Sequence, residues 1–248
     1  MRHKLTRMKK YLLALAGLLA TAALAQSPEW QKLTDDAIAL HRQGQSEKAL
    51  VPAQQALDIA VKERGENHPL TAMSLNNLAV MDRTLGKYAE AEALYLRALA
   101  IREKAPGPKN ADLAASLDNL AVLYDAQSLF EKAEPYYRRA LELREKANGP
   151  ESLEAARSLN NLGELYMAKR QYEKAEPLLK HAYAIRTAQV AKDDPQMKQS
   201  TRNLAITYAA LGQIPLAEQY ADGQVIEGLN LKLLSAPQSP GRGSDKKQ

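Results

Sequence analysis

Apolar and polar residues alternate along the middle of the chain with the spacing of amphipathic helices. In residues 70–111, apolar side chains recur at three- and four-residue steps, as at Leu75, Leu78 and Ala79, and again at Ala91 and Tyr95. A polar turn containing Gly separates the two apolar stripes. The pattern predicts two amphipathic helices in this stretch, each with one face buried against a neighbour.

The same two-helix pattern returns every 42 residues. Units 70–111 and 112–153 match most closely, because both contain S-L-x-N-L-A-V, A-E-x-x-Y-x-R-A-L and R-E-K-A-x-G-P. Units 154–195, 196–237 and 28–69 keep fewer of these residues, and the first and last are the most degenerate. A fixed period of this length indicates a stacked repeat array, in which the terminal units face solvent on one side.

Glycine and proline mark the ends of the predicted helices. Glycines fall at the turn within a unit and after its second helix, at Gly44, Gly86 and Gly212 and at Gly65, Gly107 and Gly149. Ser27 before Pro28 and Asp194 before Pro195 are predicted helix N-caps. Pro135 and Pro177 fall inside second helices, where we expect a local bend and no break. Ser128 and Arg170 replace the turn glycine in their units.

These motifs together resemble the 42-residue tetratricopeptide repeat of the kinesin light chain type, over about residues 28–234. The resemblance implies an all-α fold, a right-handed superhelical solenoid of helix-turn-helix repeats over 26–234. The repeats are expected at about 28–69, 70–111, 112–153, 154–195 and 196–237. Asp82 departs from the pattern, because it stands where Tyr124, Tyr166 and Tyr208 stand in later units. This repeat class occurs in many unrelated scaffolds, so it specifies the fold more than the function.

The first 25 residues have the pattern of a secretory signal peptide. A basic segment without acidic residues precedes the short apolar run 11–23, which ends in Ala23-Leu24-Ala25. We expect cleavage between Ala25 and Gln26 and a periplasmic or secreted mature chain with no stable membrane insertion. The alternative is an uncleaved membrane anchor, although the apolar run is shorter than the ~20 residues of a bilayer-spanning helix.

Composition adds little once the leader is set aside. Without the five basic residues of the leader, 29 Lys and Arg face 29 Asp and Glu, so the overall basic balance does not indicate a nucleic-acid partner. The chain has no Cys, so burial alone must stabilise the exported protein. The last segment, 235–248, is rich in Pro, Gly and Ser without apolar periodicity and is expected to be disordered.

The sequence shows no pattern typical of catalysis. It contains no Gly-rich phosphate loop after a strand, no His-Glu-x-x-His and no nucleophile elbow. His41, His68 and His181 lie at different repeat positions, which favours solvated or hydrogen-bonded side chains over a metal site. We therefore expect no cofactor, no metal and no enzymatic activity. An enzyme remains the alternative from another functional class.

One polar position recurs in register on the first helix of four units, forming the Asn ladder: Asn77, Asn119, Asn161 and Asn203. The resemblance places first helices on the concave face of the superhelix, and equivalent Asn residues in the kinesin light chain family are associated with holding cargo peptides. An amide both donates and accepts, so it suits a peptide backbone of any sequence. The alternative is that each Asn satisfies backbone groups of the neighbouring helix and fixes repeat stacking.

The neighbours of the ladder on the same helical faces are mostly small or apolar. They are Met73, Val80 and Thr84; Ala115, Val122 and Ala126; Arg157, Glu164 and Ala168; and Gln199, Ile206 and Ala210. Arg157 and Arg202 flank the ladder and favour an acidic side chain or a C-terminal carboxylate in the partner, unless they are simply solvated. The six predicted peptide-binding residues are these two arginines and the four asparagines.

The function predicted from the sequence is therefore that of an exported scaffold. It binds a peptide or protein partner in its concave groove, and its oligomeric state is open. The alternative binding function is an envelope or secretion-system assembly factor that docks by its convex face.

Overall fold

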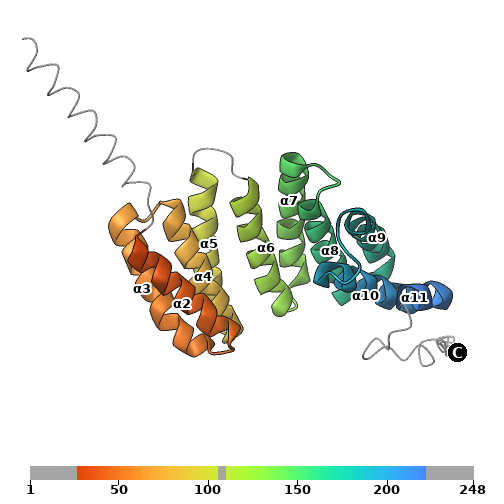
Figure 1. The fold of residues 1–248 in the computed structure, drawn as a ribbon, viewed down its shortest axis with the longest axis horizontal. Coiled ribbons are helices and arrows are strands. Elements are labelled where there is room, and N and C mark those ends of the chain that lie inside the picture. The colour runs from red at the N-terminus through yellow and green to blue at the C-terminus, as the bar shows by residue number, and fades with distance from the viewer. Residues whose placement is uncertain (1–26, 106–109, 222–248) are drawn as a thin grey trace, which may run out of the picture. The chain divides into compact units, whose positions relative to one another are not determined.

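Helices form every element of the chain that the computed structural model describes, which is residues 27–105 and 110–221 (Figure 1). Contacts divide the chain into two units, Met1–Ala105 and Pro106–Gln248, which we call unit 1 and unit 2. Unit 1 contains α2 (Pro28–Arg42), α3 (Ser46–Arg64), α4 (Pro69–Thr84) and α5 (Tyr88–Lys104). The predicted leader and C-terminal tail lie outside the described residues.

Unit 2 contains the remaining described helices. They are α6 (Asn110–Ala126), α7 (Phe130–Asn148), α8 (Leu153–Ala168), α9 (Tyr172–Gln189), α10 (Pro195–Ala210) and α11 (Ile214–Ala221). In each unit a helix packs against the one that follows it, and the first helices α8 and α10 also contact each other, as α2 and α4 do. The predicted all-α class and the helix-turn-helix repeat are confirmed.

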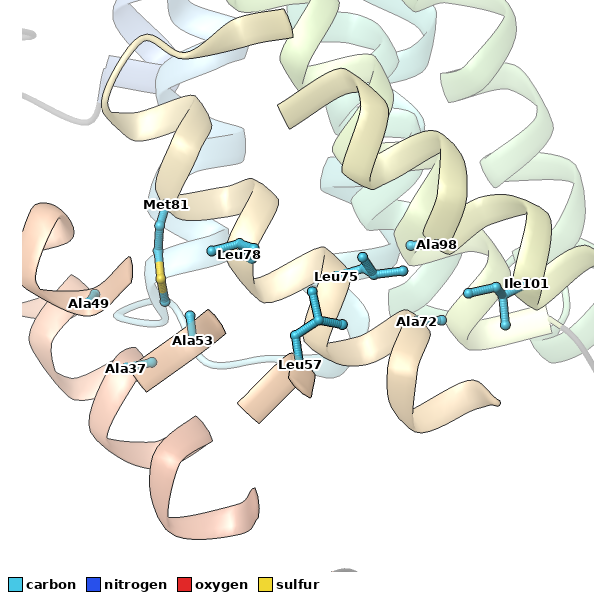
Figure 2. Packing of buried hydrophobic residues seen from close by; sticks show 10 residues of the cluster. All are labelled: Ala37, Ala49, Ala53, Leu57, Ala72, Leu75, Leu78, Met81, Ala98 and Ile101. Carbon is cyan, nitrogen blue, oxygen red and sulfur yellow. The ribbon is translucent and has the colours of Figure 1, made fainter. Parts of the chain in front are cut away.

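Alanine and leucine fill the core of unit 1. Figure 2 shows the cluster between α2, α3, α4 and α5, with side chains from Ala37, Ala49, Ala53, Leu57, Ala72, Leu75, Leu78, Met81, Ala98 and Ile101. Half of these side chains are Ala, which lets helix backbones approach closely while Leu and Met fill the space between turns. In unit 2 the same repeat positions form a smaller cluster around Ala156, Leu159, Ala182 and Ile185.

The turn between the two helices of a repeat requires one residue with a left-handed backbone. Gly44, Gly86 and Gly212 adopt φ angles of 76°, 75° and 73° there. Ser128 and Arg170 adopt φ angles of 59° and 56° at the same turn position, so the turn keeps its shape without glycine. The turn geometry therefore comes from the packing of the two helices, and glycine lowers its conformational cost.

The predicted caps and the continuity of the proline-containing helices are confirmed. The side chains of Ser27 and Asp194 accept hydrogen bonds from the backbone N–H groups of Trp30 and Gln196. Pro135 lies inside α7 and Pro177 lies inside α9, and both helices continue past them. Each proline is the sixth residue of its helix, where only the first turn loses a hydrogen bond.

Candidate functional site

One line of less buried residues follows α8 on the side where the Asn ladder lies. Arg157 and Ala168 are exposed and Asn161 and Glu164 are half-buried, whereas most of the residues between them are buried. Their spacing of four, three and four residues places them on one face of the helix. We call Arg157, Asn161 and Glu164 the α8 line. It presents a cation, an amide and a carboxylate in that order.

The ladder residues occupy the same position of their helices but have different surroundings. Asn119, Asn161 and Asn203 lie on the successive first helices α6, α8 and α10 of unit 2, and Asn77 lies on α4 of unit 1. Asn77, Asn119 and Asn161 are half-buried, while Asn203 is only 7% exposed. Within the described residues, the Asn77 and Asn161 amides make no side-chain hydrogen bond, whereas Asn119 interacts with another residue.

The amide of Asn203 is engaged by α8. One oxygen of Glu164, Oε1, accepts hydrogen bonds from Asn203 Nδ2 at 2.7 Å, Gln199 Nε2 at 2.7 Å and Asn160 Nδ2 at 3.0 Å. Asn203 Nδ2 also lies 3.1 Å from Asn160 Oδ1. The equivalent residues of the other repeats are Val80, Val122 and Ile206. The hydrogen bonds of Glu164 are therefore specific to the contact between α8 and α10. Peptide binding by Asn203 stays a prediction, and its observed contacts are with α8.

The two arginines predicted to flank the ladder both lie on exposed parts of the first helices, Arg157 on α8 and Arg202 on α10. Partial burial first, and then the positive charge of Arg144, lower the pKa of Arg157, while Asp118 and Glu154 offset part of this. Arg157 is exposed at the surface and has the positive charge of Arg144 nearby. Within the described chain, neither Arg157 nor Arg202 forms a salt bridge.

The other end of the α8 line is negative. Burial first, and then the negative charge of Glu164, raise the pKa of Asp125 on α6. The two carboxylates are therefore close enough to repel each other. Among the described residues, no Lys or Arg forms a salt bridge with either of them. The face thus changes sign along α8, from Arg157 to Glu164.

Behind this face, buried arginines join successive repeats. Arg144 of α7 is 2% exposed, and its NH2 donates to Asp118 Oδ2 of α6 at 2.5 Å, while its NH1 donates to Ser158 Oγ of α8. Arg186 of α9 is 1% exposed, and its NH1 donates to Ser200 Oγ at 2.5 Å and to the Gln196 carbonyl at 2.9 Å. Each arginine therefore ties a second helix to the first helix of the next repeat.

The structural role of these arginines was not predicted from the sequence. The signal was present, because Arg102, Arg144 and Arg186 recur at one position of the second helix, and Ser158 and Ser200 recur at one position of the first. In unit 1 the serine at that position is Ser74, and it accepts a hydrogen bond from Trp30 Nε1 at 2.8 Å. An arginine repeating in phase with buried positions indicates an internal clamp, since an unpaired buried charge is costly.

A second polar cluster connects α7 and α8 around Glu134. This carboxylate accepts hydrogen bonds from Tyr166 Oη at 2.7 Å, Arg138 NH2 at 3.0 Å and Lys169 Nζ at 3.1 Å. Burial would raise the pKa of Glu134, but these hydrogen bonds and the charge of Lys169 lower it to about 2. Tyr208 similarly donates to Glu176 at 3.3 Å in the next repeat. At Tyr166 and Tyr208, the tyrosine position of the motif therefore joins a repeat to the one before it.

The histidines take part in local contacts. His68 Nδ1 accepts from the backbone N–H of Leu70, which makes it the N-cap of α4, and His181 Nε2 lies 2.9 Å from Glu151 Oε1. Among the residues described, no three His, Asp or Glu side chains are grouped so that they could hold a metal ion. Over the same residues, the helices are too short or too polar to cross a bilayer.

Comparison with known proteins agrees with this arrangement. The Tetratricopeptide repeat family matches residues 37–104, 74–146 and 154–222. A search of the curated proteins found no match. Among solved structures, BtubC (BKLC) from P. vanneervenii is 26% identical, with 86% of this chain and 84% of that chain covered and a TM-score of 0.69.

Two further structures share the fold at lower identity. A Podosopora anserina protein with nearly identical TPR-like repeats, assigned to the kinesin light chains, is 23% identical, with 86% and 98% coverage and a TM-score of 0.67. A Rap protein in complex with Competence and Sporulation Factor is 18% identical, with 86% of this chain and 56% of that chain covered and a TM-score of 0.65. Tetratricopeptide scaffolds generally mediate protein–protein interactions and are typically not enzymes. The matched residues and the stacked helix pairs show that the chain belongs to the tetratricopeptide repeat family.

Proposed function

We propose that the mature chain is an exported scaffold that binds a segment of another protein along the first helices of unit 2, in the concave groove typical of its repeat class. The observation that carries the proposal is the state of Asn161. Its amide is half-buried in the middle of the α8 line and makes no side-chain hydrogen bond within the described residues. A half-buried amide without such a partner is suited to donate to and accept from the backbone of an extended ligand.

The four ladder residues have different roles in this proposal. Asn161 contacts the ligand, and Asn119, at the equivalent place on α6, extends the contact by one repeat. Asn203 positions α10 through the side chains of Glu164 and Asn160, and not through the backbone groups that the alternative interpretation of the sequence expected. Asn77 lies on α4 of unit 1, and peptide binding by Asn77 stays a separate prediction.

The charge of Arg157 supports an anionic group on the ligand. Arg157 is exposed and forms no salt bridge within the described residues, so it can pair with an acidic side chain or a C-terminal carboxylate, although Asp118 and Glu154 already offset part of the positive charge there. Arg202 on α10 is exposed and would strengthen the same preference, although an exposed ion pair contributes only about 0.2–1 kcal/mol. The Rap protein structure supports binding by this fold, because it contains Competence and Sporulation Factor in complex with a protein that shares the fold.

Export forms part of the proposal because the N-terminal segment combines a basic start, a short apolar run and Ala23-Leu24-Ala25. Sequencing the N-terminus of the cell-associated protein tests it. A mature chain beginning at Gln26 is expected, and a chain that still begins at Met1 would remove export from the proposed function.

Site-specific photo-crosslinking separates the first-helix side from the second-helix side. A photoreactive phenylalanine replaces Ala126, which is exposed on α6 in line with Asn119, or Glu142, which is exposed on α7. We expect a discrete crosslinked partner from position 126 and none from position 142. The reverse result would favour an assembly factor that docks by its convex face.

A further inference from the structure

The α8 line offers opposite charges at its two ends, and neither charge is neutralised by a salt bridge within the described residues. Arg157 and Glu164 are seven residues apart on one helix face, with the amide of Asn161 between them. At 1.5 Å rise per residue, the two charged positions lie ~10 Å apart along the helix. The line therefore has a direction, which a uniformly charged surface lacks.

The carboxylate of Glu164 is fixed in place. Its Oε1 accepts from the amides of Asn160, Gln199 and Asn203, so the side chain is held between α8 and α10. These donors are neutral amides, so they orient the carboxylate without forming a salt bridge, and the positive charge that acts on Glu164 is that of the buried Arg186. Burial first, and then the charge of Glu164, raise the pKa of Asp125, so a second acidic side chain lies at this end of the line.

Arg157 is fixed less firmly, but its surroundings define its preference. The positive charge of buried Arg144 acts on it, and the charges of Asp118 and Glu154 offset part of that effect; Arg144 is itself engaged by Asp118 and Ser158. A second cation near this end of the line would be repelled, while a carboxylate would be attracted. The two ends of the line thus select opposite charges in a ligand.

From this arrangement we infer that the partner segment is bipolar, with an acidic side chain that pairs with Arg157 and a lysine or arginine that pairs with Glu164. An extended chain of the polyproline II type rises ~3.1 Å per residue and returns to the same side every three residues, so charges three positions apart span ~9 Å. That span matches the ~10 Å between the two ends of the α8 line. The inference rests on the proposed function, because it specifies which segment the first-helix face binds.

Short synthetic peptides of defined charge test the inference directly. The bipolar probe is a blocked glycine-serine peptide with one aspartate and, three positions later, one lysine. The comparison probes carry two aspartates, two lysines or two serines at those positions. Binding to the mature protein is followed by NMR, through shifts of the backbone amides of α8. We expect the bipolar probe to bind about three- to tenfold more tightly than each comparison probe at low salt, with the preference lost at about 1 M salt.

Two conservative variants assign the preference to its residues. Glu164→Gln keeps an oxygen that accepts from the α10 amides and removes only the charge. With this variant, the bipolar probe should bind no better than a peptide with aspartate at the first position and serine in place of the lysine. Arg157→Gln should remove the contribution of the aspartate instead. Glu173→Gln on α9 and Lys192→Gln between α9 and α10 change exposed charges away from the line and should leave every affinity unchanged.

The outcomes distinguish this inference from the proposed function. If the two-serine probe shifts the α8 amides as strongly as the bipolar probe, a peptide face exists but charge does not select its ligand, and the inference is overturned. If the bipolar probe does not bind at its highest soluble concentration, the inference is overturned as well. The proposed function then still depends on the crosslinking result at position 126.

Discussion

At Gly163, α8 packs closely against α9, and replacing this residue offers a quantitative test of the packing. A Cβ atom at Gly163 of α8 would lie 2.6 Å from Cδ2 and 2.7 Å from Cγ of Leu179 on α9. Leu179 is fully buried. In repeats 70–111 and 112–153, the residue equivalent to Gly163 is Ala and the residue equivalent to Leu179 is Tyr.

Two opposing effects determine how much Gly163→Ala changes the free energy of unfolding. Overpacking a filled core lowers the free energy of unfolding by ~1–3 kcal/mol, while Ala in place of Gly inside a helix raises it by ~1 kcal/mol. We therefore expect a net loss of about 1 kcal/mol, or a fall in melting temperature of ~2–4 °C for a chain of this size. In a Leu179→Ala background the overpacking is relieved, so the same substitution should stabilise the protein by up to ~1 kcal/mol.

Thermal and urea unfolding followed by circular dichroism measure all four members of this cycle. The expected result is a change of sign, with Gly163→Ala destabilising beside Leu179 and stabilising beside Ala at that position. A substitution that stabilises both backgrounds equally would refute the close approach of α8 and α9 at Gly163.

Three further predictions follow from particular residues of unit 2. Ala133→Leu should lower the melting temperature more than Ala217→Leu, because both alanines are fully buried but Ala217 lies in the last described repeat; equal losses in thermal melts would contradict this. Ser128→Gly or Arg170→Gly should raise the melting temperature by up to ~2–4 °C, since each exposed residue has a left-handed backbone that costs ~1 kcal/mol without glycine. The pKa of Glu134 is about 2 in the folded chain, against 4.5 for the carboxyl without its partners. The ionised carboxylate therefore contributes at most about 3 kcal/mol to the free energy of unfolding. This contribution is fully present above pH 4.5 and is lost as the pH falls toward 2. Glu134→Gln should flatten that part of the pH–stability curve, and an unchanged curve would show that the cluster around Glu134 does not stabilise the fold.

The helices and turns could be predicted because they depend on local spacing. The period of apolar residues and the turn glycines locate each helix pair, and the repeat supplies the same information several times. Ser128 and Arg170 show the limit of this reasoning, because the left-handed turn persists without glycine. The place of these residues in the repeat therefore predicted the left-handed turn better than their residue type did.

The surroundings of the Asn ladder could not be predicted, since they depend on single substitutions between neighbouring repeats. Glu164 replaces an aliphatic residue on α8, and for that reason the amide of Asn203 on α10 is bound internally while that of Asn161 is not. The buried position of Arg144 was also missed, because its partner Asp118 lies 26 residues away and only stacking brings them together. Periodicity identifies equivalent positions, but their contacts differ from one step to the next.

The contrast between Asn161 and Asn203 provides the most direct test of the central claim, that the first-helix face of unit 2 binds a protein partner. Asn161→Leu and Asn203→Leu are compared by thermal melting and by crosslinking from position 126 on the same samples. For Asn203→Leu, the loss of contacts to Glu164 and Asn160 should lower the free energy of unfolding by ~1–3 kcal/mol. For Asn161→Leu, the account predicts an unchanged melting temperature and a tenfold or greater loss of partner capture. A lowered melting temperature for Asn161→Leu, with capture reduced only in proportion to the folded fraction, would show that the ladder is structural and contradict the account.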